Sequence, residues 1–163
     1  MPPHPNRPGY TNDFADPRKK YDGRYRSPAK PPPATAGPTV TSSVRPQRCP
    51  ATHALMFSDY PTFRPNLTPR QVMQRGSFGG TYFRPIHSSV TNRAYANAAS
   101  EFPRAWWKGL TPSVHLESAT YDTAVNRYRV ACGGSLDMWE SSGWIHAHDP
   151  YGWFQWYCRF YRG

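Results

Sequence analysis

Hydrophobic positions follow a regular period most clearly at the C-terminal end of the chain, where seven of the last fifteen residues are aromatic. Rings at i, i+3, i+4, i+7 and i+8 form one face of an α-helix, with Gln155, Arg159 and Arg162 on the other side. Asp149 followed by Pro150 is a helix-start signal. The pattern predicts a C-terminal helix whose rings turn inward as the centre of a small core, or form a stacking platform for a ligand. The residues of this face are Trp153, Trp156, Tyr157, Phe160 and Tyr161.

A second helix is predicted from a capping box. Thr68 is followed by Pro69 and, three residues on, by Gln71, whose side chain can reach back to the start of the helix. Gly76 can adopt the left-handed conformation that ends a helix. The sequence therefore predicts a short helix over residues 69–75.

Two more short helices are predicted further along. One opens at Ser100-Glu101-Phe102-Pro103, contains the adjacent tryptophans Trp106 and Trp107, and is ended by Gly109. Because neighbouring positions on a helix point about 100° apart, only one of these two rings is expected to be fully buried. The other helix begins at Ser135 and ends near Gly143.

The segment Gly76-Ser77-Phe78-Gly79-Gly80 lets the backbone bend where a Cβ would clash. A phosphate cradle is one reading, but no Gly-Lys-Ser/Thr follows, and a closely packed structural turn is favoured. Residues 82–86 read as a short extended segment. Residues 118–132 fit both a helix and a strand, so their structure stays open.

Composition changes sharply near residue 50. Of the 19 prolines, twelve lie in residues 1–50, whereas all six tryptophans lie beyond residue 105. We therefore predict a disordered, basic, proline-rich tail over residues 1–50, which contains a dense patch at Arg18-Lys19-Lys20. That patch is a nuclear-import signal or a nucleic-acid-contacting arm, or else a solvated linker. As a third possibility, the proline-rich tail recruits groove-binding protein partners.

Residues 51–163 are predicted to form one mainly α domain of short helices joined by ordered glycine- and proline-bearing loops. This part of the chain is rich in large aromatic side chains and poor in aliphatic ones. Because each aromatic side chain can bury a large apolar area, an aromatic core is expected.

Cysteine usage and hydropathy indicate the compartment. Cys49, Cys132 and Cys158 are odd in number and widely spaced, which argues against a disulfide framework and favours a reducing environment. The chain has no apolar run long enough to span a membrane and no secretory signal pattern. We expect a protein without a membrane partner, in the nucleus or cytoplasm.

Candidate chemistry for an enzyme is weak. His146 and His148 are the best metal candidates, but a further ligand would have to come from elsewhere, such as Cys132, Glu140 or His115. No paired metal-binding motif and no nucleotide, flavin or haem fingerprint is present, so we expect no metal and no cofactor. An enzyme of unknown reaction that uses His146 and His148 with Glu140 or Cys132 is the alternative to a binding protein.

Charge and aromatic content together favour a non-enzymatic nucleic-acid-binding module. The net charge is +10, and lysine and arginine neutralise phosphates while exposed rings stack on unpaired bases. Tyr82, Trp107 and Tyr151 lie beside turns and are expected to be exposed rings. The alternative is a basic surface over an aromatic core that binds no nucleic acid. The candidate phosphate contacts are Arg84, Arg93, Arg104, Lys108, Arg127, Arg129, Arg159 and Arg162.

Three segments of the chain form an unusual combination: Leu67-Thr68-Pro69-Arg70, the segment from Gly76 to Phe83, and Gly152-Trp153-Phe154-Gln155-Trp156-Tyr157-Cys158-Arg159-Phe160-Tyr161. Together they resemble a family of uncharacterised fungal and bacterial proteins. The resemblance covers roughly residues 55–163 and implies a single conserved module, without an activity to carry over. Because members of that family continue past the aromatic helix, the resemblance also implies that this chain is a shortened version.

Overall fold

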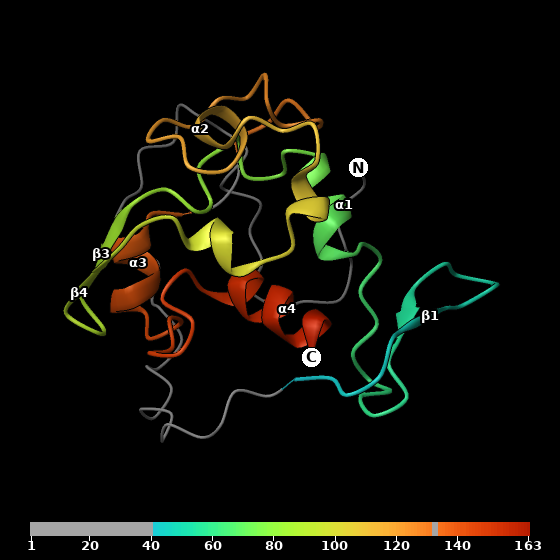
Figure 1. Ribbon diagram of the computed structural model, residues 1–163. Coiled ribbons are helices and arrows are strands. Elements are labelled where there is room, and N and C mark those ends of the chain that lie inside the picture. The colour runs from blue at the N-terminus through green and yellow to red at the C-terminus, as the bar shows by residue number, and fades with distance from the viewer. Residues whose placement is uncertain (1–40, 132–133) are drawn as a thin grey trace, which may run out of the picture.

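The computed structural model describes residues 41–131 and 134–163 (Figure 1). Its α-helices are α1 (Pro69–Gln74), α2 (Pro112–His115), α3 (Leu136–Ser141) and α4 (Trp153–Arg162), and its 3-10 helices are η2 (Ala98–Glu101) and η3 (Arg104–Trp107). Two antiparallel hairpins pair β1 (Gln47–Arg48) with β2 (Leu55–Met56), and β3 (Ile86–Ser88) with β4 (Arg93–Tyr95).

The prediction of a mainly α domain is wrong. In the described part of the chain, short helices and two small antiparallel sheets are separated by longer ordered loops. Local signals predicted the starts of α1 and α3 correctly, but in the loops side chains hydrogen-bond the backbone and hold it in turns. Asn126 is an example, because its amide donates to the Val130 carbonyl and accepts from the Tyr128 N–H, which holds residues 126–130 in turns. Residues 118–131 accordingly form neither the helix nor the strand that their pattern allowed.

The folded part begins before residue 50. The Ser42 N–H donates to the Phe160 carbonyl, and the Ser42 hydroxyl donates to the carboxylate of Asp59. With β1 also lying in this stretch, residues 41–50 belong to the fold and not to the predicted tail. Residues 1–40, with the remainder of that tail and its basic patch, lie outside the described residues.

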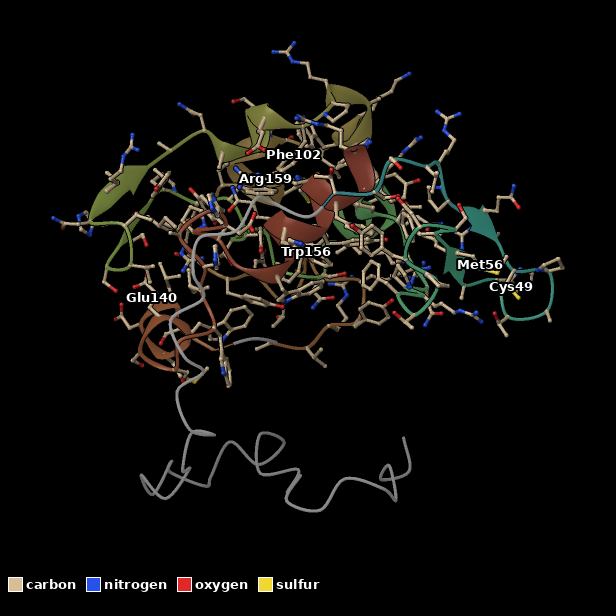
Figure 2. All side chains as sticks on the ribbon, turned by 90° about the horizontal axis from the view of Figure 1, so that it is seen from below. Cys49, Met56, Phe102, Glu140, Trp156 and Arg159 are labelled. Atoms are coloured by element: carbon tan, nitrogen blue, oxygen red, sulfur yellow. The ribbon has the colours of Figure 1, made fainter. Side chains whose placement is uncertain are left out.

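Helix α4 is the element around which the other segments pack. It lies beneath α1 and the 3-10 helices in Figure 1, and Figure 2 shows Trp156 and Arg159 near the centre of the molecule. The fully buried side chains of α4 include Phe154, Cys158 and Phe160, whereas Trp153 is 51% exposed. The prediction of which α4 side chains are buried is therefore only partly correct. Other segments cover this helix on several sides, so buried residues lie on more than one face of it.

The core is aromatic, as its composition predicted. Nine of the fifteen residues in the buried cluster are Phe, Tyr or Trp. Most ring pairs meet edge to face, for example Phe57 with Phe160 at 5.0 Å and Tyr82 with Phe154 at 5.0 Å between centroids. This arrangement places the positive edge of one ring on the negative face of another and stabilises each pair by about 0.5–1.5 kcal/mol beyond burial.

The start of α4 differs from the prediction. Asp149 lies in a turn that precedes the helix, and the cap position is held by Gly152, which has no side chain and a φ of 90°. The N–H of Gln155, at the third helical position, donates instead to the hydroxyl of Tyr82 at 2.9 Å. That hydroxyl donates in turn to the Tyr151 carbonyl at 2.7 Å, and the Gln155 side chain accepts from the Tyr151 N–H. Tyr82 thus supplies from a distant segment the cap that Gly152 lacks.

The predicted capping box of α1 is confirmed. The Thr68 hydroxyl accepts from the Gln71 N–H, and the Gln71 side chain accepts from the Thr68 N–H. Gly76 follows the helix with a φ of 58°, and a Cβ there would collide with the carbonyl oxygen of Val125. The glycine segment is therefore a closely packed structural turn, as favoured from the sequence.

Two of the remaining predictions were correct in position. Ser135 begins α3, accepting a hydrogen bond from the Met138 N–H. The tryptophan pair lies in a 3-10 helix in place of the expected α-helix, and Trp107 is buried while Trp106 is half-buried. The extended segment expected over residues 82–86 forms a strand only from Ile86 onward. No helix of residues 41–131 or 134–163 has the length and apolar character needed to cross a bilayer.

Replacement of Tyr82 by phenylalanine is expected to lower the free energy of unfolding by about 1–3 kcal/mol, because it leaves a buried N–H and a buried carbonyl without a partner. Urea unfolding followed by far-ultraviolet circular dichroism measures the change. Tyr161→Phe is the matched control, since no described group hydrogen-bonds the Tyr161 hydroxyl. Equal stability of the two variants would show that Tyr82 does not cap α4.

Candidate functional site

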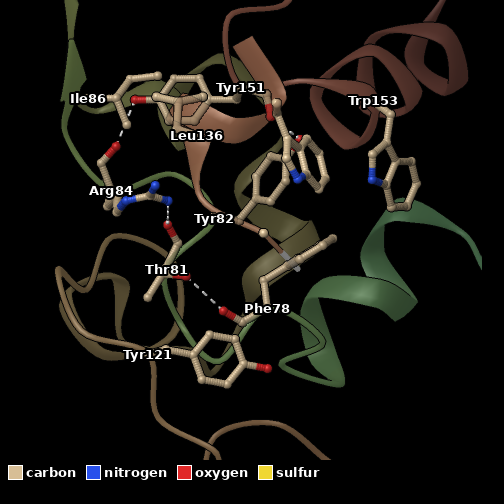
Figure 3. A pocket seen from close by; sticks show the side chains of 11 residues that line it. Phe78, Thr81, Tyr82, Arg84, Ile86, Tyr121, Leu136, Tyr151 and Trp153 are labelled. Atoms are coloured by element: carbon tan, nitrogen blue, oxygen red, sulfur yellow. Dashed lines mark hydrogen bonds between the residues drawn. The ribbon is translucent and has the colours of Figure 1, made fainter. Parts of the chain in front are cut away.

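An aromatic pocket opens between the glycine turn, α3 and the start of α4 (Figure 3). Its volume is about 310 Å³, at the small end of the range of about 300–1,000 Å³ for ligand sites. We call this site the aromatic pocket. The side chains that define it are Phe78, Tyr82, Arg84, Trp139, Tyr151 and Trp153.

Trp153 forms the exposed aromatic wall of the pocket. It is the first residue of α4, and its ring lies 6.2 Å from that of Phe78 and 5.6 Å from that of Phe154, between centroids. Half of its surface nevertheless stays open to solvent. A large ring held by neighbours on one side and open on the other can stack on a planar ligand without a change in the fold.

Arg84 supplies the positive charge of the pocket, on the side away from Trp153 (Figure 3). Its guanidinium donates from Nη1 to the Thr81 carbonyl at 3.1 Å, and among the described residues no carboxylate pairs with it. The Tyr151 hydroxyl donates to the Arg84 carbonyl at 2.9 Å and so positions this segment. Burial raises the pKa of Tyr151 to about 12, which keeps that donor protonated at neutral pH.

The structure brings together three of the residues singled out from the sequence, Tyr82, Arg84 and Tyr151. The expectation that Tyr82, Tyr151 and Trp107 are exposed rings is wrong, because all three are buried. They lie beside turns, but those turns fold back onto the core. The ring that does reach solvent at the pocket is Trp153, which its helical spacing placed in the core. No local signal marks it, because its exposure depends on which segments cover α4.

A second group of side chains, the basic cluster, surrounds the C-terminal end of α1. The Gln74 amide donates to the carbonyls of Trp106 and Lys108, which ties η3 to α1. The Arg75 carbonyl accepts from the Arg127 N–H, which ties the loop of residues 121–130 to the same end. These bonds gather cations from three segments. The basic cluster consists of Arg70, Arg75, Arg104, Lys108, Arg127 and Arg129, with the ring of Tyr128.

The basic cluster faces solvent, and no carboxylate of the described residues forms an ion pair with it. Tyr128 is 53% exposed and its hydroxyl accepts a hydrogen bond from Arg75 at 2.8 Å. Within residues 41–131 and 134–163, the ion pairs are those of Arg159, and none involves a cation of the basic cluster. Uncompensated positive charge on an exposed surface is available to an anionic partner.

Arg159 has a different role from the one predicted. Its guanidinium donates two hydrogen bonds to the Glu101 carboxylate, at 2.6 and 2.8 Å. It also donates to the Asp149 carboxylate and to the His148 carbonyl. Burial raises the pKa of Asp149 even though Arg159 attracts its charge. With its donors used inside the fold, Arg159 joins α4 to η2 and is not open to a phosphate. Arg162 is exposed and donates one bond to the Glu101 carbonyl.

The described residues of the enzyme alternative are not assembled into a metal site. His146 and His148 lie with rings stacked 5.0 Å apart between centroids. No group of three or more His, Cys, Asp or Glu side chains among the described residues is placed to hold a metal ion, and Cys132 lies outside those residues. Glu140 is buried, and it accepts hydrogen bonds from the hydroxyls of Ser88 and Ser89 at 2.8 and 2.6 Å. It therefore holds α3 against the β3–β4 hairpin.

Comparisons with protein-family models, with curated proteins and with solved structures gave no match to this chain. The resemblance to fungal and bacterial proteins stays a prediction.

Glu140→Gln is expected to lower the free energy of unfolding by about 1–2 kcal/mol at neutral pH, because hydrogen bonds to a charged acceptor are stronger. Burial by itself would raise the pKa of Glu140, but the bonds from Ser89 and Ser88 outweigh it and lower the pKa below the usual 4.5. The ionised carboxylate therefore adds stability above about pH 4.5, and this contribution is lost as the pH falls through the lowered value.

Urea unfolding between pH 7 and pH 3 tests this prediction. The difference between Glu140→Gln and the parent should shrink to nothing in acid, whereas the control Glu117→Gln should show little difference at any pH. A difference that stays constant across the range would contradict the role given to the Glu140 charge.

Proposed function

We propose that the chain is a non-enzymatic nucleic-acid-binding module, with the basic cluster as its phosphate-contacting surface. The observation that carries the proposal is the gathering of six cations from α1, η3, the residues directly after each, and the loop of residues 121–130. Asp122 is the one carboxylate that these segments carry, and it accepts a hydrogen bond from the Ala124 N–H and pairs with none of the six cations. Each cation that meets a phosphate releases a condensed counterion, so that several together give an affinity that depends on salt and little on sequence.

The distribution of negative charge supports the same proposal. Of the seven carboxylates beyond residue 50, five accept hydrogen bonds within the described part of the fold. One of them is Asp122, which accepts from the Ala124 N–H. Asp59 binds Ser42 and Ser43, Glu140 binds two serines, and Glu101 and Asp149 pair with Arg159. These carboxylates are bound by groups of the fold and do not pair with the cations of the basic cluster. The electrostatic potential at that surface is therefore expected to be positive.

The exposed ring of Tyr128 adds a second kind of contact. It stands among the cations of the basic cluster, and Arg75 holds its hydroxyl. Aromatic faces at a basic surface stack on unpaired bases, which favours single strands over duplexes. A protein with this role, whose odd number of widely spaced cysteines favours a reducing environment, suits the nucleus or cytoplasm. Residues 1–50 would add nine Lys/Arg against three Asp to the attraction.

Neutralisation of two cations, in the variant Arg127→Gln with Arg129→Gln, is expected to weaken binding of a short fluorescent oligothymidylate by about tenfold at low salt. Because each phosphate contact on a single strand contributes about 0.7 to the slope of log affinity against log salt, the slope should fall by about 1.4. Fluorescence anisotropy across a salt series measures both quantities.

The double variant Arg45→Gln with Arg93→Gln removes the same charge from exposed positions outside the basic cluster and is the matched control. It should keep most of the affinity and of the slope. Equal losses in the two double variants would show that net charge alone, and not this surface, attracts the strand. Absence of binding by the parent at low salt would overturn the proposed function.

A further inference from the structure

We propose that the aromatic pocket takes one unpaired base of the bound strand, with Trp153 stacking on the base and Arg84 holding a neighbouring phosphate. The inference rests on the proposed function and assigns to it a second, base-reading site. It joins three observations: the wall of rings, the cation on the other side, and the loop that leads from the basic cluster to the pocket.

The rings of the pocket suit a planar, polarisable ligand. Phe78 and Tyr82 lie 4.5 Å apart between centroids and line the pocket, and Trp153 contributes a half-open indole at its edge. Every nucleobase has two π faces that stack on such rings whatever its hydrogen-bonding edge. In a duplex those faces are covered by neighbouring base pairs, so only an unpaired base can enter.

Arg84 makes the ligand an anionic one. Its single side-chain bond within the described residues is from Nη1 to the Thr81 carbonyl, which leaves donors of the guanidinium fork open toward the pocket. A forked guanidinium matches phosphate oxygens in geometry and charge. The same charge disfavours a cationic ligand, such as a methylated lysine, that aromatic walls alone would accept.

One loop connects the pocket with the basic cluster. Tyr121 lines the pocket, and its hydroxyl donates to the Val130 carbonyl and accepts from the Asn126 amide. Between these anchor points the loop carries Arg127 and Arg129 of the basic cluster. A nucleic-acid strand whose phosphates contact these cations therefore runs along the loop as far as the pocket, where one base can enter.

The test compares two strands of equal length, an oligothymidylate and an abasic oligonucleotide that has the phosphates without the bases. The parent protein should bind the oligothymidylate at least tenfold more tightly, because one base stacks on Trp153 and another can stack on Tyr128. Trp153→Ala should reduce this preference by about tenfold while its affinity for the abasic strand stays unchanged. Trp153→Phe should recover part of it.

Trp156→Ala is the matched control, since Trp156 lies on the same helix, its ring contacts Phe63 and Phe160, and it does not line the pocket. It should keep the preference. Arg84→Gln should weaken the binding of both strands and reduce their salt dependence, and thermal unfolding checks that each variant remains folded.

A readout on the parent protein avoids any effect of the variants on folding. Addition of thymidine monophosphate should shift the nuclear magnetic resonance signals of the Trp153 and Trp139 indole N–H groups and leave that of Trp156 in place. Unshifted Trp153 and Trp139 signals overturn the inference.

The two proposals fail in different ways. If the parent binds both strands equally, or if Trp153→Ala keeps the full preference for bases, the pocket does not read a base and the basic cluster remains the binding surface. If the parent binds neither strand at low salt, the proposed function is overturned as well. If Arg84→Gln keeps both the base preference and the affinity for the two strands, Arg84 does not bind a phosphate, and this part of the inference is overturned.

Discussion

The hydroxyl of Tyr82 is the contact on which the rest of this structure depends. It accepts from the Gln155 N–H and donates to the Tyr151 carbonyl, and so begins α4 at a glycine that offers no cap of its own. Burial raises the pKa of Tyr82 well above its usual value, so the hydroxyl keeps its proton. One hydroxyl thus pairs both the buried Gln155 N–H and the buried Tyr151 carbonyl. These two bonds fix the residue at which α4 begins and the orientation of the helix.

The aromatic pocket follows from that starting point. Because α4 begins immediately after Gly152, Trp153 stands at the edge of the core with its ring half open, and Phe154 takes the fully buried position behind it. The ring of Tyr82, fixed by the same hydroxyl, lines the pocket, and the Tyr151 hydroxyl holds the Arg84 segment on the other side. The contact that starts the helix therefore also places the aromatic and charged walls of the candidate site.

The basic cluster has a comparable structural origin. Gln74 and Arg75, at the end of α1, hold η3 and the loop of residues 121–130 through backbone carbonyls and an N–H. These bonds use the backbone and the Gln74 amide, and leave the cationic heads of the neighbouring residues facing solvent. Arg159 shows the opposite arrangement, since its head is enclosed by Glu101 and Asp149 and serves stability.

The sequence by itself determined those features whose causes lie within a few residues. The capping box of Thr68 and Gln71, the start of α3 at Ser135 and the close-packed glycine turn were all readable, because their partners or their conformational needs are local. The aromatic character of the core followed from composition. Only the tertiary structure decided that the fold is not mainly α, that Trp153 faces solvent, and that Arg159 is paired. Those outcomes depend on partners far along the chain, 73 residues apart for Tyr82 and Gln155 and 58 for Glu101 and Arg159, which no local period encodes.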